Sequence, residues 1–263
     1  MAFFTVLSAS SAQADEQGSL RIMAAGSLRP AMTDLLAAFT TISSRTSTSA
    51  YGASGLLRKQ IEAGQPVDLF ASADMNQPRM LAEKRHGVGT VLFARNKLCL
   101  LVRERVGASQ DSLLERLLDP TVRLATSTPG SDPSGDYTWA MFARAEAAHP
   151  GAQAVLQAKA MQLVGGPDSK PLVPGRNAAA GVFLADRADA MPVYCSGAPA
   201  LVREVPGLVA LSLPPTLAVT SAAGLIVLTD DPDAARFALF ILSEAGQDIL
   251  ARHGFEPVAK SPG

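Results

Sequence analysis

The segment that decides the fold is YGASGLLRKQIEAGQPVDLFASAD, residues 51–74, in which small residues lead into a helix, a Gly/Pro break and a strand. Ser54 occupies a position typical of a helix N-cap, and apolar residues follow it at helical spacing as far as Gly64. A helix N-terminus with free N–H groups beside a serine hydroxyl favours an anion. The segment therefore predicts a ligand cradle, with an ordinary Ser-capped helix as the alternative.

Strand, serine turn and helix already occur in this order upstream of the cradle. A strand near 20–24 precedes Gly26 and Ser27, and a helix is expected from about 30 to 40. Two such units in succession imply a parallel sheet with helices on its faces. Ligands bind beyond the carboxyl ends of the strands in such sheets, where Ser27 and Ser54 fall.

The second half of the chain shows similar units. A turn-rich loop at 128–137 enters a helix, residues 174–177 open another, and a strand at 190–194 ends at Tyr194. Apolar runs at 91–102 and 217–228 are suited to carry the chain across and back. We expect a final amphipathic helix over 233–252, ended by Gly254.

The predicted fold class is therefore α/β with two lobes, each a mainly parallel sheet flanked by helices. A hinge of two strands would join the lobes and close them around a ligand. The expected limits are 19–97 and 224–260 for the first lobe, and 98–223 for the second.

The block QIEAGQPVDLFASAD, residues 60–74, resembles the signature segment of periplasmic molybdate-binding proteins, the solute receptors of molybdate ABC transporters. The likeness extends from RIMAAGSL at 21–28 to Gly254 and Phe255. This resemblance implies a monomeric periplasmic-binding-protein fold that captures molybdate or tungstate for an ABC transporter permease. It also implies that the protein has no cofactor and performs no covalent chemistry.

The same resemblance implies which residues hold the oxyanion, as contacts to its oxygens and not as metal ligands. The turn around Ser54 lacks one family hydroxyl, so the amide of Ala53 or Gly55 must substitute for it. Cys195-Ser196-Gly197 also departs from the family pattern of Gly-Ser-Asp after the tyrosine. The residues carried over are Ser27 and Ser54, the amide of Ser134, the amide position at Gly175, and the Tyr194 hydroxyl.

Several side chains near this site allow two interpretations. Arg176 either points at the anion or lies at the surface, and Tyr194 is either a ligand contact or a core aromatic. Asp132 and Asp136 are typical of turns and helix starts. An aspartate in the cleft would repel a fully ionised oxyanion but accept the proton of hydrogen phosphate, which would favour phosphate over molybdate or sulfate.

The composition disfavours several other partners. A formal net charge of −1 with few aromatic residues favours neither nucleic acid nor an anionic membrane. Residues 1–14 predict the end of a secretory signal with cleavage before Asp15, although no Lys or Arg precedes the apolar run. Beyond it, no apolar run reaches membrane-spanning length. We expect Cys99 to be a buried free thiol, with a disulfide to Cys195 as the alternative.

Catalysis is disfavoured because the three histidines, His86, His149 and His253, lie at predicted element ends without a catalytic or metal-binding motif. A receptor for sulfate, phosphate or a small carboxylate is the alternative within the same fold. An inward Arg176 would favour the carboxylate. The effector-sensing domain of a transcription regulator would need a DNA-binding segment in addition.

Overall fold

The computed structural model describes residues 18–84, 87 and 89–258. The predicted signal segment at 1–14 and His86 lie outside the described residues. In the part of the chain that is described, no helix has both the length and the apolar character that a membrane crossing requires.

The first lobe is built on a mixed sheet with the strand order β10-β4-β9-β3-β1-β2. β1 pairs in parallel with β2 and β3, as the two strand–turn–helix units predict. β9 runs antiparallel to both β3 and β4. The strands are β1 (Leu20–Ala25), β2 (Ser47–Gly52), β3 (Leu69–Ser72), β4 (Thr90–Arg103), β9 (Thr220–Val227) and β10 (Glu256–Pro257).

The second lobe extends the sheet from the far half of β4. β7 and β8 both pair antiparallel with β4, while β5 pairs in parallel with β6. The α/β architecture with two lobes is confirmed. Its antiparallel pairs are those of β4 with β7, β8, β9 and β10 and that of β9 with β3. The strands of this lobe are β5 (Ala125–Ser127), β6 (Met161–Val164), β7 (Ala190–Tyr194) and β8 (Leu208–Ser212).

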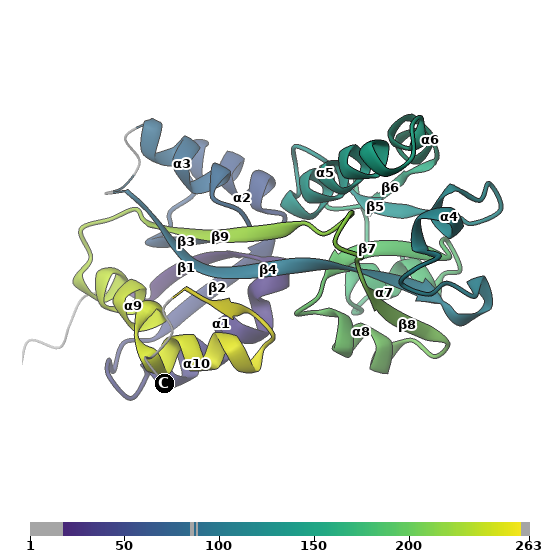
Figure 1. Cartoon of the computed structure of the whole chain (residues 1–263). Coiled ribbons are helices and arrows are strands. Elements are labelled where there is room, and N and C mark those ends of the chain that lie inside the picture. Colours follow the sequence, from purple (N-terminus) through teal and green to yellow (C-terminus); the bar gives the residue numbers. More distant parts are fainter. Residues whose placement is uncertain (1–17, 85–86, 88, 259–263) are drawn as a thin grey trace, which may run out of the picture.

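The lobes are joined through β4 and the start of β9, which run side by side across the middle of the molecule (Figure 1). β4 is a single strand of 14 residues with an irregularity between Leu92 and Ala94. Its residues 90–97 pair with β9 and its residues 98–103 pair with β7 and β8. One strand therefore fixes the register of both lobes.

Helices cover both lobes (Figure 1). Those of the first lobe are α1 (Arg29–Phe39), α2 (Ser54–Glu62), α3 (Asn76–Glu83), α9 (Pro232–Leu242) and α10 (Glu244–Arg252). Those of the second are α4 (Leu113–Leu118), α5 (Pro133–Ala148), α6 (Ala152–Lys159), α7 (Ala178–Leu184) and α8 (Ala198–Glu204). Short 3₁₀ turns follow β1 and β4, namely η1 (Gly26–Leu28) and η2 (Glu104–Val106).

The prediction of one final helix over 233–252 is wrong, because α9 and α10 are separate. Ser243 lies between them in an extended conformation, and its hydroxyl accepts a hydrogen bond from the Gly246 amide. The serine therefore caps the second helix. The apolar stripe continues through the break, since Phe237, Ile241 and Leu250 are all buried, and this continuity concealed the boundary.

Cys99 and Cys195 form a disulfide, so the expectation that Cys99 is a free thiol is wrong. Cys99 lies on β4 and Cys195 directly follows β7, and the pairing of Leu98 with Tyr194 brings the two cysteines together. Their Cα atoms are 4.9 Å apart, although 96 positions separate them in the sequence. The bond ties the end of β7 to the strand that crosses between the lobes.

We expect the double substitution Cys99→Ser and Cys195→Ser to lower the free energy of unfolding by about 3–5 kcal/mol, because the bond closes a long loop in the unfolded chain. Urea denaturation of the variant and of the oxidised native protein measures the difference. Native protein treated with a reductant should match the variant. Equal midpoints for the oxidised native protein and the variant would contradict a structural role for the disulfide.

Candidate ligand-binding site

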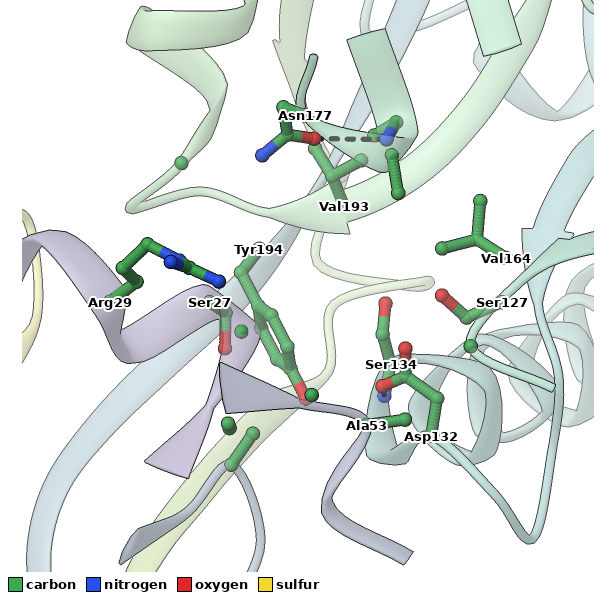
Figure 2. Close-up of a pocket in the computed structure, with 18 of the residues that line it drawn as sticks. Ser27, Arg29, Ala53, Ser127, Asp132, Ser134, Val164, Asn177, Val193 and Tyr194 are labelled. Carbon is green, nitrogen blue, oxygen red and sulfur yellow. Dashed lines mark hydrogen bonds between the residues drawn. The ribbon is translucent and has the colours of Figure 1, made fainter. Parts of the chain in front are cut away.

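A cavity of about 770 Å³ lies between the lobes and is lined by residues of both (Figure 2). Its first-lobe wall is formed by residues that follow β1, β2 and β3. The second-lobe wall comes from the start of α5, the loop before α7 and the end of β7. All five of the predicted site residues line it, namely Ser27, Ser54, Ser134, Gly175 and Tyr194.

Strand register explains why the two first-lobe serines share this wall. Ala25 at the end of β1 pairs with Gly52 at the end of β2, so the segments that follow both strands leave the sheet at the same edge. Ser27 lies in η1 directly after β1, and Ser54 opens α2 after β2. The carboxyl-end rule thus correctly placed both serines at the cavity.

Ser54 is fully buried, but it does not cap α2 as predicted. The N-cap is Ala53, which has no side chain able to cap, and the Ser54 hydroxyl oxygen accepts a hydrogen bond from the Ala73 amide at 3.2 Å. Ser54 thereby ties α2 to the segment after β3. Its hydroxyl proton remains available as a donor, since the oxygen acts as an acceptor in that contact.

The amide of Gly55, one of the two predicted substitutes for the missing hydroxyl, is already engaged. It donates to the Ser131 carbonyl oxygen at 2.9 Å, across the boundary between the lobes. Ala53, the other predicted substitute, lines the cavity. The Gly55–Ser131 hydrogen bond therefore joins the start of α2 directly to the loop before α5.

Asp132 is the N-cap of α5, and its carboxylate accepts a hydrogen bond from the Ser134 amide at 3.0 Å. That amide was the predicted ligand contact, and the structure shows it engaged in capping. The group of Ser134 left for a ligand is its hydroxyl. Asp132 itself lines the cavity, so one of the two aspartates considered from the sequence does enter the cleft.

Tyr194 combines both roles that the sequence left open. Its ring belongs to the hydrophobic core and meets the ring of Tyr137 edge-on at 6.4 Å between centroids. Its hydroxyl is buried and has no hydrogen-bond partner among the described residues. Burial, followed by the negative charge of Asp132, holds the pKa of this phenol well above its ordinary value, so Tyr194 is a neutral donor.

The segment before α7 contributes backbone and one amide side chain. Asn177 caps α7 by accepting a hydrogen bond from the Ala179 amide at 2.9 Å, and Gly175 precedes it with φ of 73°. The Arg176 side chain is 57% exposed and forms an ion pair with Glu204 at 3.6 Å. Its guanidinium is thus held at the rim of the cavity, which agrees with the surface interpretation.

Among the described residues that line the cavity, the sequence did not predict three with polar side chains, namely Arg29, Ser127 and Asn177. Arg29 begins α1 with its guanidinium carbon 4.4 Å from the centre of the Tyr51 ring. Ser127 ends β5, a strand in parallel pairing, so the carboxyl-end rule that located Ser27 would have found it. Figure 2 shows Ser27 and Arg29 on one side of the cavity, and Ser127, Asp132 and Ser134 on the other.

The site has the chemistry of a non-covalent binding pocket. Its walls supply neutral hydroxyl donors from both lobes, two arginines and one carboxyl group. The described residues include no cluster of histidine, cysteine and carboxylate side chains suited to a metal ion. A two-lobed α/β fold with a polar cavity between the lobes is the architecture of solute-binding proteins.

The chain belongs to the family of bacterial extracellular solute-binding proteins, because the sequence model of that family matches residues 20–256. The family consists of substrate-binding proteins and not of enzymes, which confirms the expectation of no catalysis. A similar protein is Uncharacterized protein PM1146 of Pasteurella multocida strain Pm70, 37% identical over 239 residues, or 90% of this chain and 98% of that one. Molybdate-binding protein ModA of Escherichia coli K12 is 30% identical over 135 residues, or 49% of this chain and 52% of that one.

Solved structures show the same fold at lower identity. The periplasmic molybdate-binding protein of Azotobacter vinelandii has a TM-score of 0.71 at 18% identity, over 92% of this chain and 100% of that one. The sulfate-binding protein SubI of Mycobacterium tuberculosis has a TM-score of 0.76 at 20% identity, over 92% of this chain and 88% of that one. These similarities establish the architecture.

We expect Tyr194→Phe to leave the stability of the ligand-free protein unchanged or raise it by about 1 kcal/mol, because it removes a buried hydroxyl without a partner. Tyr137→Phe is the matched control. The Tyr137 hydroxyl accepts a hydrogen bond from the Ala222 amide at 3.3 Å, so its loss should destabilise by about 1 kcal/mol. Thermal unfolding of both variants measures this, and a large loss for Tyr194→Phe would show that the hydroxyl has a structural partner.

Proposed function

We propose that the protein is the receptor of an ABC importer and binds a tetrahedral oxyanion, with molybdate or tungstate as the first candidates. The observation that carries this proposal is the Tyr194 hydroxyl, buried at the cavity without a partner. A buried donor left unpaired costs free energy that a ligand oxygen would recover. Hydrogen bonds to an ionised acceptor are about twice as strong as neutral ones, so hydroxyl donors suffice to hold a dianion.

Similarity to molybdate-binding proteins supports molybdate among the oxyanions, and tungstate is included because it is a tetrahedral dianion of nearly the same size. One relative of 30% identity is a molybdate-binding protein, and a molybdate receptor shares the fold. Within this proposal Ser27 and Ser54 donate from the first lobe, and Tyr194 and the Ser134 hydroxyl donate from the second. Gly175 and Ala53 supply backbone amides at opposite walls.

Phosphate is a second candidate, and the position of Asp132 favours it. A carboxylate that lines the cavity repels a fully ionised oxyanion and accepts the proton of hydrogen phosphate. A small carboxylate ligand has weaker support, because Arg176 pairs with Glu204 at the rim. Sulfate belongs in the test because a sulfate receptor shares the fold.

Periplasmic location, a monomeric state and delivery to a permease complete the proposal. Family membership as an extracellular solute-binding protein supports the location and the transporter partner. Capture would proceed by closure of the lobes about β4 and β9. The Gly55–Ser131 hydrogen bond would form part of the closed contact.

Isothermal titration of the chain from Asp15 onward with molybdate, tungstate, sulfate and phosphate tests the function. We expect one-to-one binding, with molybdate and tungstate tightest. Tyr194→Phe should weaken binding roughly tenfold to a hundredfold, the worth of a hydrogen bond to a charged group, while Tyr137→Phe should bind as the native protein does. Absence of heat with all four anions would refute the oxyanion proposal and call for a screen of carboxylates.

We expect Gly55→Ala to raise the dissociation constant about tenfold, because a smaller fraction of the protein would reach the closed state. A Cβ at this position would lie 2.7 Å from the Ser131 carbonyl oxygen, too close without moving the lobes apart. Alanine also favours the helix, so the first lobe should not lose stability.

Lys59→Ala is the matched control on the same helix, because Lys59 is exposed and does not line the cavity. Titration with the tightest anion and thermal unfolding are measured for both variants. Unchanged affinity in Gly55→Ala would show that the α2–Ser131 contact has no part in closure.

A further inference from the structure

Asp132 is the one carboxyl group among the described residues that line the cavity. The carboxylate accepts a hydrogen bond from the Ser134 amide at 3.0 Å, which fixes its position at the start of α5. Figure 2 shows the carboxyl group beside the side chains of Ser127 and Ser134, on the same cavity as the Tyr194 hydroxyl. The acid therefore belongs to the binding surface.

The backbone at Gly165 lies close to the Asp132 carboxyl group and leaves no room for a side chain. Gly165 follows β6 with φ of 76°, and a Cβ added there would lie 2.4 Å from the Asp132 Oδ2 atom. Gly165 also lines the cavity. The carboxyl group is thus confined between a helix start on one side and a close backbone on the other.

The surroundings of Asp132 disfavour its negative charge. Burial raises the pKa of the carboxyl group, and the charges of Asp136 and Asp74 raise it further, against the opposing hydrogen bonds from Ser134 and Ser127. A bound oxyanion would add more negative charge to the same space. The other ionisable groups at the cavity or beside it are Tyr194, Tyr137, Arg29 and Arg176.

We propose that Asp132 makes binding proton-linked, so that a fully ionised oxyanion such as molybdate or sulfate enters the cavity together with one proton, carried by Asp132. The protonated carboxyl group then donates a hydrogen bond to the anion in place of repelling it. Monohydrogen phosphate carries a proton of its own, so its hydroxyl can donate a hydrogen bond to the ionised Asp132 carboxylate. This inference rests on the proposed function and names Asp132 as the residue that determines specificity among oxyanions.

Titration with molybdate in two buffers of different ionisation enthalpy counts the protons taken up. Where Asp132 is ionised in the free protein, we expect uptake of about one proton per anion and a dissociation constant that rises up to tenfold per pH unit. At lower pH, where Asp132 is already protonated in the free protein, the dissociation constant should not change with pH. Monohydrogen phosphate should bind with less uptake than molybdate.

Asp132→Asn keeps an oxygen that accepts from the Ser134 amide and replaces the acid by a permanent donor. Molybdate should bind this variant with no proton uptake and with no pH dependence between about pH 6 and pH 9. Asp111→Asn is the matched control for the loss of one carboxylate, since Asp111 is exposed and does not line the cavity. Its uptake should match that of the native protein.

Binding of molybdate to the native protein without proton uptake would overturn the inference and leave the proposed function intact. An unchanged pH slope in Asp132→Asn would also overturn it, because the proton would then reside elsewhere. Failure of every anion to bind would overturn the proposed function, and the inference with it.

Discussion

The backbone hydrogen bonds of β4 are the constraint on which the rest of the structure depends. One half of this strand pairs with β9 and the other half with β7 and β8, so each lobe takes its register from the same segment. That register sets Leu98 opposite Tyr194 and brings Cys99 beside Cys195. The position of Tyr194 at the cavity therefore depends on the pairing of β7 with β4, and β4 also pairs with β9 in the first lobe.

The cavity is assembled from the ends of regular elements more than from charged side chains. The 3₁₀ turn after β1 supplies Ser27, the end of β7 supplies Tyr194, and helix starts supply Ser54 and Ser134. Such a wall would hold the proposed anion through oriented dipoles and hydroxyls, and each lobe positions its own donors before the lobes close. Asp132 is the exception, because its role depends on a proton that neither the fold nor the helix start supplies.

The sequence predicted where the site lies better than how each group acts. Parallel strands have their carboxyl ends at the same edge of the sheet, so the local sequence pattern was enough to place Ser27 and Ser54 together. The Ser54 hydroxyl accepts a hydrogen bond from the Ala73 amide, and the Asp132 carboxylate accepts one from the Ser134 amide. The sequence did not predict these partners, because hydrogen-bond partners depend on contacts that form only in the folded chain. The disulfide and the Arg29–Tyr51 contact were hidden for the same reason, since local pattern does not encode distant neighbours.

The close approach between Gly165 and Asp132 links two positions that lie far apart in the sequence. Any larger residue at 165 would strike the carboxyl group, and the φ of 76° favours glycine there as well. During divergence of the family, a relative that keeps the acid should consequently keep glycine at the position of residue 165. A relative with a side chain at the position of Gly165 would have lost the acid as well, and with it this means of telling one anion from another.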